Sequence, residues 1–223
     1  MGNAQLDLIY RSLPLLMQGA GMTFITLLSA GCLSLCFGTL FGVLTCQRLK
    51  TSVISPLIDG ITFILRAVPF YVQLLIIYFV LPDILNINLE AFTASIIALG
   101  ICSSGYVTQV VRCGINSIPL EQWESASTLG YSTSSSVRYI IFPQMMRNIL
   151  PALTNELDAL LKSTAILSSI GVLELTRMGM NIVSREMEPL AIYLAVAGIY
   201  VVISGILNLI SKYLEKRIRY ANS

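Results

Sequence analysis

Histidine is absent from the 223 residues, and charged residues make up only 12% of them. Without an imidazole side chain, the protein cannot use histidine as a catalytic acid or base or as a metal ligand. The five cysteines include no Cys-x-x-Cys pair; they are Cys32, Cys36, Cys46, Cys102 and Cys113. Each lies in or beside an apolar segment, so we expect small, buried side chains with no metal ion and no cofactor.

Basic charge is also scarce, since the formal net charge is only +2 and no run of Lys or Arg is present. Binding to a phosphate backbone needs such clusters, so nucleic acid is not an expected partner. The chain contains no Gly-x-x-x-x-Gly-Lys-Ser/Thr phosphate loop and no Gly-x-Ser-x-Gly nucleophile motif. An intramembrane enzyme would need a cluster of nucleophile, base or metal ligands, which is missing, so we expect a protein that is not an enzyme.

Apolar residues dominate instead, at 55% of the chain with a mean hydropathy of +0.77. Soluble domains carry about 25% charged residues, roughly twice the share found here. The composition therefore predicts an all-α polytopic protein that resides in a lipid bilayer.

About five transmembrane helices are expected, because a span needs roughly 20 mainly apolar residues. Three come from charge-free windows, at about 20–46, 91–111 and 189–211. Two further candidates, Ile54–Leu81 and Asn148–Leu173, contain charged residues that must face protein or water; these are Asp59, Arg66, Glu156, Asp158 and Lys162. Arg66 precedes Pro69 and would lie near the membrane surface if the helix proper begins after it.

Lys and Arg residues set the orientation, because they concentrate on the cytoplasmic side of membrane proteins. They gather in the segments that lie inside when the C-terminus is cytoplasmic, so an odd number of spans leaves the N-terminus outside. The expected organisation is an amphipathic outer segment at 1–18, a transmembrane domain at 19–215 and a cytoplasmic tail at 216–223.

A polar, serine-rich island at 121–143 interrupts the apolar pattern and would lie inside. Pro119 suits the first turn of a helix, and Gly130 can adopt the left-handed conformation that ends one, which predicts a short helix over 119–129. Trp123, Ala126 and Leu129 would form an apolar stripe along it. Such a helix could dock on a partner protein or lie on the lipid with Trp123 as its anchor.

The spacing within the island resembles the "EAA" signature of the membrane subunits of bacterial ATP-binding-cassette (ABC) importers. Glu124-Ser125-Ala126 is followed by three residues and Gly130, and then, after nine intervening residues, by Ile140, one spacer and Phe142-Pro143. The resemblance implies the type I ABC importer permease fold, with a coupling helix at about 119–130. The residues it assigns to ATPase coupling are Glu124, Ser125, Ala126, Gly130 and Pro143.

Further stretches resemble the polar-amino-acid branch of this family, in the glutamine, histidine and arginine transporters. They are Leu13-Pro14-Leu15-Leu16, Leu65-Arg66-Ala67-Val68-Pro69, Arg112-Cys113-Gly114-Ile115-Asn116-Ser117-Ile118-Pro119, Leu160-Leu161-Lys162-Ser163-Thr164 and Ile170-Gly171-Val172-Leu173-Glu174-Leu175-Thr176. Gln109 and Ser163 stand where the branch usually has Glu and often has Asp, which puts a cationic substrate in doubt and leaves a polar amino acid such as glutamine.

Partners and localisation follow from the same resemblance. It implies two copies of a separate ATPase subunit, an extracytoplasmic solute-binding protein and either a second copy of this chain or a sister permease. It also implies a multi-pass protein of the bacterial inner (plasma) membrane, with ATP hydrolysed by the partner. An ion-gradient-driven secondary carrier or channel is the alternative, although the paired repeats typical of such carriers are not evident.

Candidate residues for a substrate path are the polar side chains of three spans: Gln73, Ser103, Ser104, Asn155, Asp158 and Lys162. Lys162 could meet the carboxylate of an amino acid and Asp158 its ammonium group. The two lie four residues apart, so they could also form an internal ion pair on one helix face. A further alternative is a path that only excludes other solutes, with all selectivity in the external binding protein.

Overall fold

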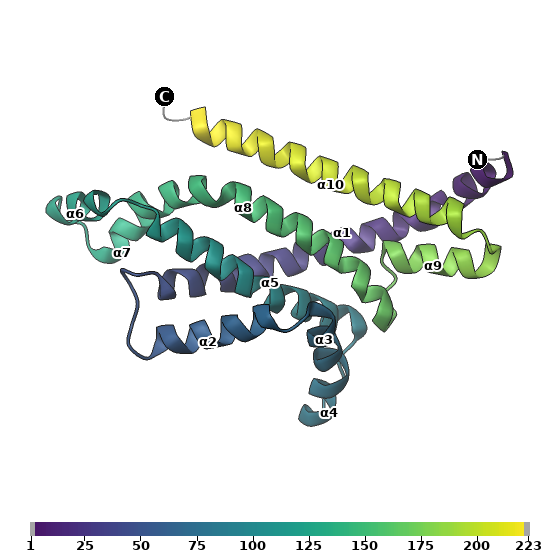
Figure 1. Cartoon of the computed structure of the whole chain (residues 1–223), viewed down its shortest axis with the longest axis horizontal. Helices are drawn as coiled ribbons and strands as arrows, with labels where there is room; N and C mark the ends of the chain where they lie inside the picture. Colours follow the sequence, from purple (N-terminus) through teal and green to yellow (C-terminus); the bar gives the residue numbers. More distant parts are fainter. Residues whose placement is uncertain (1–2, 221–223) are drawn as a thin grey trace. The chain divides into compact units, whose positions relative to one another are not determined.

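Every regular element is helical in residues 3–220, which are the part of the chain that the computed structural model describes (Figure 1). This confirms the expected all-α class. The elements are α1 (Asn3–Thr45), α2 (Ile54–Ala67), α3 (Phe70–Leu75), η1 (Ile76–Val80), α4 (Leu81–Leu85), α5 (Ala91–Asn116), α6 (Leu120–Thr128), α7 (Thr133–Ser136), η2 (Val137–Ile141), α8 (Phe142–Ser163), η3 (Thr164–Ile170), α9 (Leu175–Glu186) and α10 (Pro189–Tyr220). Of these, η1 and η2 are π-helical and η3 is a 3-10 helix.

Three helices are long and apolar enough to cross a membrane, namely Ala4–Thr45, Ala91–Asn116 and Pro189–Arg217. The number becomes five if each of two bent pairs forms one span, Ile54–Ala67 with Phe70–Leu85 and Thr133–Ile170 with Leu175–Glu186. All five predicted windows overlap these segments, but two of them are broken. In addition, α1 passes without interruption through residues 18 and 19, where the sequence predicted a boundary.

Proline causes the first break. Pro69 disfavours helical geometry in the residue before it, and Val68 is accordingly extended, with φ −82° and ψ 130°. The helix α2 therefore ends at Ala67 and α3 begins after Pro69. Arg66 belongs to the last turn of α2, where its Nε donates to the Thr62 carbonyl oxygen at 3.2 Å. Arg66 thus lies inside α2, and a new helix begins only after Pro69.

Glycine and a buried acid make the second break. Gly171 has φ +86° and ends η3, since only a residue without Cβ adopts that conformation readily. Three residues later, Glu174 caps α9 by accepting hydrogen bonds from the backbone N–H groups of Thr176 at 2.8 Å and Arg177 at 2.7 Å. The predicted span Asn148–Leu173 includes Gly171 and ends just before Glu174, and no helix was predicted where α9 lies.

The described residues form two compact units, and the four long helices α1, α5, α8 and α10 contribute to both. The first unit comprises the chain up to Cys32, Pro69–Gly100 and Leu157–Asn208; the second comprises Leu33–Val68, Ile101–Glu156 and the chain from Leu209 onward. Each unit has its own apolar core.

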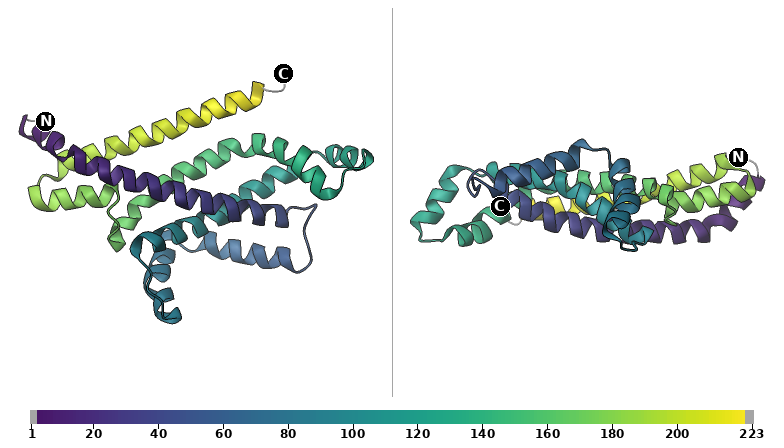
Figure 2. Two further views of the ribbon diagram at one scale, coloured as in Figure 1. Left: turned by 180° about the vertical axis from the view of Figure 1, so that it is seen from behind. Right: turned by 90° about the horizontal axis from the view of Figure 1, so that it is seen from below.

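Within the first unit, the first half of α1 lies beside α9 and the start of α10 (Figure 2). The buried side chains of Leu16, Leu175, Ile182 and Ile192 fill this contact. Tyr200 of α10 donates to the Glu174 carboxylate at 3.1 Å, so the group that caps α9 also holds α10. Glu174 is fully buried.

Within the second unit, two glycines allow α1 and α5 to approach closely. Gly38 and Gly42 are four residues apart on α1, in the Gly-x-x-x-Gly spacing typical of tightly packed membrane helices. A Cβ atom at Gly38 would lie 2.5 Å from the Val107 Cβ, and one at Gly42 would lie 2.6 Å from the Val111 Cβ and 2.9 Å from the Thr108 carbonyl oxygen. The seam therefore has no room for side chains at these positions.

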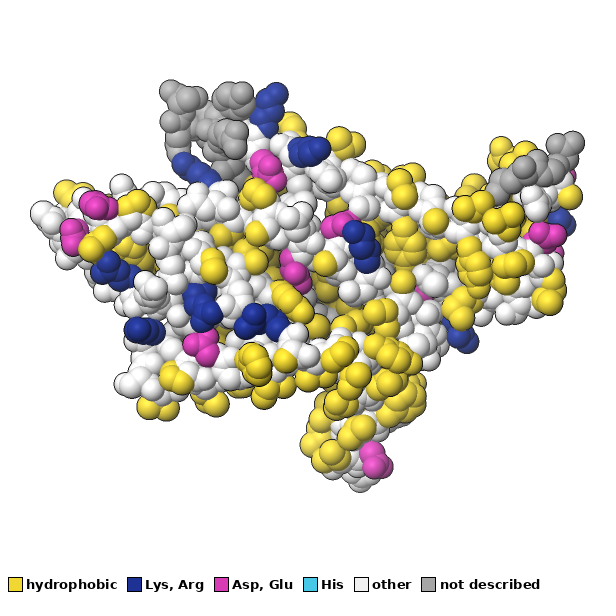
Figure 3. Space-filling model, viewed as in Figure 1, with side chains coloured by type: hydrophobic (Ala, Val, Ile, Leu, Met, Phe, Trp, Pro, Cys, Tyr) yellow, Lys and Arg dark blue, Asp and Glu magenta, His cyan; other side chains and the backbone are white. Residues whose placement is uncertain are grey.

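Many large apolar side chains remain exposed, as the yellow surface over α3 and α4 shows (Figure 3). Exposed apolar surface of this extent is expected where lipid or another protein covers a helix. The cysteines are divided in the same way between buried and exposed positions. Cys46 and Cys102 are buried, whereas Cys32, Cys36 and Cys113 are exposed. The prediction that all five are buried is wrong for three, because an apolar position in a membrane helix can equally face lipid.

The close contact of Gly38 and Gly42 with α5 should contribute to the stability of the protein. Gly42→Leu should lower the melting temperature of the detergent-purified protein, because the new side chain collides with backbone as well as with Val111. Overpacking of this kind costs about 1–3 kcal/mol or more. Gly21→Leu on the same helix is the control, since nothing lies within 4 Å of a Cβ atom there. Equal melting temperatures for the two variants would contradict the close approach.

Candidate functional site

The short helix predicted in the polar island is present as α6, and its C-terminus is fixed by Gly130. The N–H of Tyr131 donates to the Ala126 carbonyl oxygen and that of Gly130 to the Ser127 carbonyl oxygen, both at 3.0 Å. These two bonds form a Schellman motif, in which the residue just past the helix end has a left-handed conformation. Gly130 supplies it with φ +80°, and no atom lies within 4 Å of where a Cβ would be. Backbone conformation, and not space, therefore favours glycine here.

Contacts with the second unit hold α6 in place on one side. Ala126 is fully buried, and Trp123 packs against the apolar cluster that includes Ile141 and Met145. The Gln144 Nε2 donates to the Gln122 Oε1 at 3.2 Å, which joins α6 to the start of α8. The helix is thus a fixed feature of this unit.

The other side of α6 is exposed and combines acidic with apolar groups. Glu121 and Glu124 are exposed in its first half, and Leu129, just beyond its end, is 74% exposed. The predicted stripe is therefore divided, with Ala126 against the chain itself and Leu129 free for an external contact. Of the residues assigned to coupling, Ala126 is buried, and the exposed ones are Glu124, Ser125, Gly130 and Pro143.

Two of the predicted path residues, Ser103 and Ser104, lie on α5 in the second unit and are buried. Ser103 belongs to a polar chain across three helices, in which the Ser34 Oγ donates to the Ser103 Oγ at 2.8 Å and Ser103 donates to the Glu156 Oε1 at 2.8 Å. Ser104 instead donates to the Ile101 carbonyl oxygen at 2.6 Å. Asn155 belongs to the same unit and is exposed.

The other three path residues, Gln73, Asp158 and Lys162, belong to the first unit. The Lys162 Nζ lies 2.6 Å from the Asp158 Oδ2, so the predicted ion pair along one helix face is present. Ser204 of α10 donates to the other oxygen of the same carboxylate. Gln73 is buried on α3.

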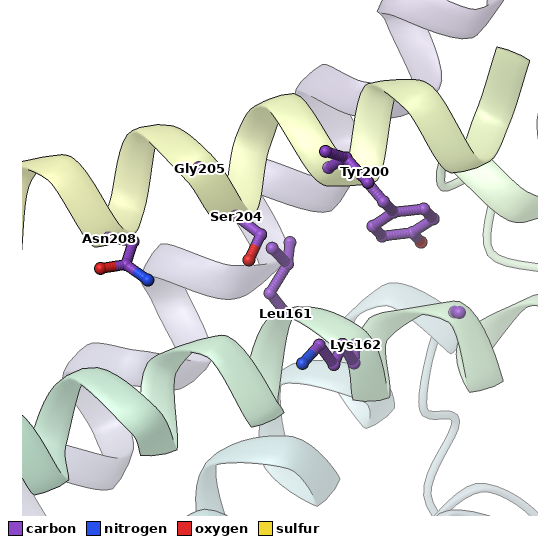
Figure 4. Close-up of a pocket in the computed structure, with 8 residues that line it drawn as sticks. Leu161, Lys162, Tyr200, Ser204, Gly205 and Asn208 are labelled. Carbon is purple, nitrogen blue, oxygen red and sulfur yellow. The ribbon is translucent and has the colours of Figure 1, made fainter.

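A pocket of about 510 Å³ opens beside this ion pair, between the end of α8 and α10 (Figure 4). Its polar lining consists of Lys162, Tyr200, Ser204 and Asn208. The remaining wall is apolar or has no side chain, and is made by Leu161, Ala165, Val201 and Gly205. Pockets with an apolar lining and a few polar groups are typical of small-molecule sites.

The second unit has a pocket of its own, about 700 Å³ in volume, between α5 and α8. Gln109, Ser117 and Asn148 are among the residues that line it. The Gln109 Oε1 accepts from Arg112, whose other terminal nitrogen lies 2.5 Å from the Asp59 Oδ1. Asp59, one of the charges that interrupt the predicted span Ile54–Leu81, is thus paired with Arg112 near the end of α5.

Sequence reasoning missed the polar side chains of α10, because Ser204 and Asn208 lie in the most uniformly apolar window. Their spacing of four residues places them on one helix face and was the available signal. Glu156 was also not among the predicted site residues. An acid within a membrane span is a reason to expect a hydrogen-bond or ion-pair partner, and here that partner is Ser103.

Comparisons with known proteins agree with this architecture. The family model described as "Binding-protein-dependent transport system inner membrane component" matches residues 34–220. The glutamine transport system permease protein GlnP of Escherichia coli (strain K12) is 32% identical over 214 residues, which are 95% of this chain and 96% of that protein. The arginine transport system permease protein ArtQ of Bacillus subtilis (strain 168) is 30% identical over 210 residues, covering 93% of this chain and 94% of ArtQ.

A solved structure shows the same fold. In the crystal structure of an amino acid ABC transporter with histidines, one chain superposes with a TM-score of 0.86 at 32% sequence identity. The superposition covers 97% of this chain and all of the other.

Proposed function

The chain belongs to the family of inner membrane components of binding-protein-dependent transport systems, and we propose that it couples solute passage to a separate ATPase in an importer of a polar amino acid such as glutamine. It is a multi-pass permease of the bacterial inner membrane. What we propose beyond this is coupling to a separate ATPase, transport into the cell and a polar amino acid as the solute.

One observation carries the coupling role: α6 is a short helix fixed on one side by its own unit and exposed on the other. Buried Ala126 and half-buried Trp123 secure it, and a Schellman motif at Gly130 fixes its end. A docked partner could contact the exposed Glu124 and Leu129. Because α6 is held firmly by its unit, a movement of the partner would be passed on to the membrane helices, whereas a loosely attached helix would move by itself. The sequence has no phosphate loop of its own, so the partner would supply ATP hydrolysis.

The glutamine assignment rests on relatives and on neutral side chains. GlnP proteins are named as glutamine permeases, whereas ArtQ is named as an arginine permease at similar identity. Gln109, which replaces an expected acid, accepts a hydrogen bond from Arg112, and Asp59 pairs with the same arginine. A cationic substrate would find these groups already compensated, which favours a neutral polar solute.

The assembly proposed has two membrane chains, two ATPase subunits and an extracytoplasmic solute-binding protein. The second membrane chain is another copy of this one or a sister permease. Exposed apolar surface, such as that of α10 and α3, would then be divided between lipid and the second membrane chain.

Uptake into whole cells tests the function. Cells that carry the gene should accumulate labelled glutamine from a panel of amino acids, and cells that lack it should not. The uptake should continue when the proton gradient is dissipated but ATP is maintained. Uptake that collapses with the gradient would indicate an ion-driven carrier instead.

The cap of α6 predicts how coupling fails. Gly130→Val should lower both transport and solute-stimulated ATPase activity at least tenfold, because a β-branched residue resists the left-handed conformation. Gly130→Asn should retain most of both activities, since asparagine tolerates that conformation. Similar activities in the two variants would show that the cap plays no part in coupling.

The orientation predicts which cysteines react from each side. In a variant without native cysteines, Asp83→Cys should react with an impermeant thiol reagent in intact cells, whereas Ser134→Cys should react only in inside-out vesicles. Both positions are exposed, so burial does not limit the reaction. The reverse pattern would place α6 outside and remove it from the ATPase.

A further inference from the structure

The pocket between α5 and α8 in the second unit contains a buried hydrogen-bond donor that the chain leaves unused. The Gln109 Oε1 accepts from Arg112, and because an arginine side chain has only donors, the amide oxygen of Gln109 must be the atom that faces it. The Gln109 Nε2 is buried and has no hydrogen-bond partner in the described part of the chain. A buried donor without a partner is costly, so an acceptor atom of a group bound in the pocket would be favoured there.

Asn148, on the α8 side of the same pocket, provides an unused acceptor. Its Nδ2 donates to the Ser117 Oγ at 3.2 Å, and the Ser117 hydroxyl donates to the Gly114 carbonyl oxygen at 2.8 Å. The Asn148 Oδ1 therefore has no hydrogen-bond partner among the described residues. The side chains that line the pocket include no charged group. These polar groups suit a neutral amide compound, which can both accept and donate hydrogen bonds.

Cys113 lies between these two polar groups. Gln109, Cys113 and Ser117 follow one another at intervals of four residues, so they lie on one face of α5. Eight residues of α-helix rise by about 12 Å, so the lining extends along the helix with Cys113 in its middle. Cys113 is exposed and lines this pocket of about 700 Å³. A group attached to its Sγ could therefore extend along the pocket in both directions.

The other exposed cysteines have different surroundings. Cys32 and Cys36 lie on α1 within the charge-free predicted span at about 20–46, where an exposed side chain faces lipid or another protein. Cys113 is followed by the polar residues Asn116 and Ser117 and then by α6. The thiolate is the nucleophilic form of cysteine and is poorly stabilised in apolar surroundings. Cys113 is therefore the exposed cysteine best placed to react.

We propose that Cys113 is a site of reversible S-thiolation by a small peptide disulfide, with Gln109 and Asn148 binding amide groups of the attached peptide. The Cys113 thiol loses its proton and attacks one sulfur of the disulfide. The S–S bond of the small molecule breaks, and its other half leaves as a thiolate that takes up a proton. One disulfide is exchanged for another, so no additional oxidant is required.

A peptide attached to Cys113 would occupy the space between α5 and α8 close to α6. The helix α6 begins at Leu120, seven residues after Cys113, and Gln144 of α8 is hydrogen-bonded to it through Gln122. Filling the pocket would restrict movement of α5 and α8 against each other. Transport would then respond to oxidation of the small-thiol pool. This consequence rests on the coupling role proposed above, whereas the modification itself does not.

Mass spectrometry of the purified permease–ATPase complex tests the modification. With oxidised glutathione as the probe, Cys113 should become the principal modified residue of the permease, and dithiothreitol should remove the adduct. Cys32 and Cys36 are the controls within the same chain and should remain unmodified. Modification of these two at the rate of Cys113, or no modification of Cys113, would overturn the proposal.

Binding of the peptide by the pocket is tested with a second reagent, hydroxyethyl disulfide, which has the same reactive bond but no amide group. Gln109→Met should slow the reaction of Cys113 with oxidised glutathione about 2- to 10-fold, the effect of losing one hydrogen bond, and leave the reaction with hydroxyethyl disulfide unchanged. Asn148→Leu should have the same selective effect. Gln18→Met makes the matching change on α1 outside the pocket and should alter neither rate. Selective slowing in neither pocket variant would contradict recognition by the pocket.

ATPase activity tests the consequence separately. Solute-stimulated hydrolysis by the wild-type complex should fall in proportion to the modified fraction and return after dithiothreitol. The Cys113→Ser complex, treated in the same way, should keep its activity. Full activity of a fully modified complex would overturn the regulatory role. If the untreated complex showed no solute-stimulated hydrolysis, the proposed function would fail, and mass spectrometry would still decide the modification.

Discussion

The absence of water from the bilayer interior is the constraint on which this structure depends. A backbone group without a hydrogen-bond partner is costly in lipid, so a spanning segment must satisfy its own amides within a helix. The interruptions consequently occur where the sequence supplies a local solution. Pro69 has no N–H to satisfy, and Gly171 is followed by the Glu174 cap.

The same constraint governs the charged side chains within the bent segments. Asp59 faces Arg112, Asp158 faces Lys162, and Glu156 accepts from Ser103. Pairing lowers the cost of keeping these groups away from bulk water, and it also limits what each can do for a solute. Lys162 differs from the others because it is paired with Asp158 while its side chain is still 70% exposed.

Much of this could be predicted from the sequence, because it follows from local rules. Apolar windows located the long helices, and the Pro119 to Gly130 spacing located α6 together with its left-handed end. The spacing of Asp158 and Lys162 predicted their contact. The remainder depends on tertiary structure. Only the fold shows that Ala126 faces its own unit, or that Ser204 reaches Asp158 from another helix.

Crosslinking from α6 tests the central claim, that this helix is the surface on which the ATPase docks. In a background without native cysteines, a cysteine in place of Leu129, which is 74% exposed, should crosslink to the ATPase subunit with a short bifunctional reagent. A cysteine in place of fully buried Ala126 should not. The absence of any crosslink from Leu129 in a complex that still hydrolyses ATP and transports would contradict the account.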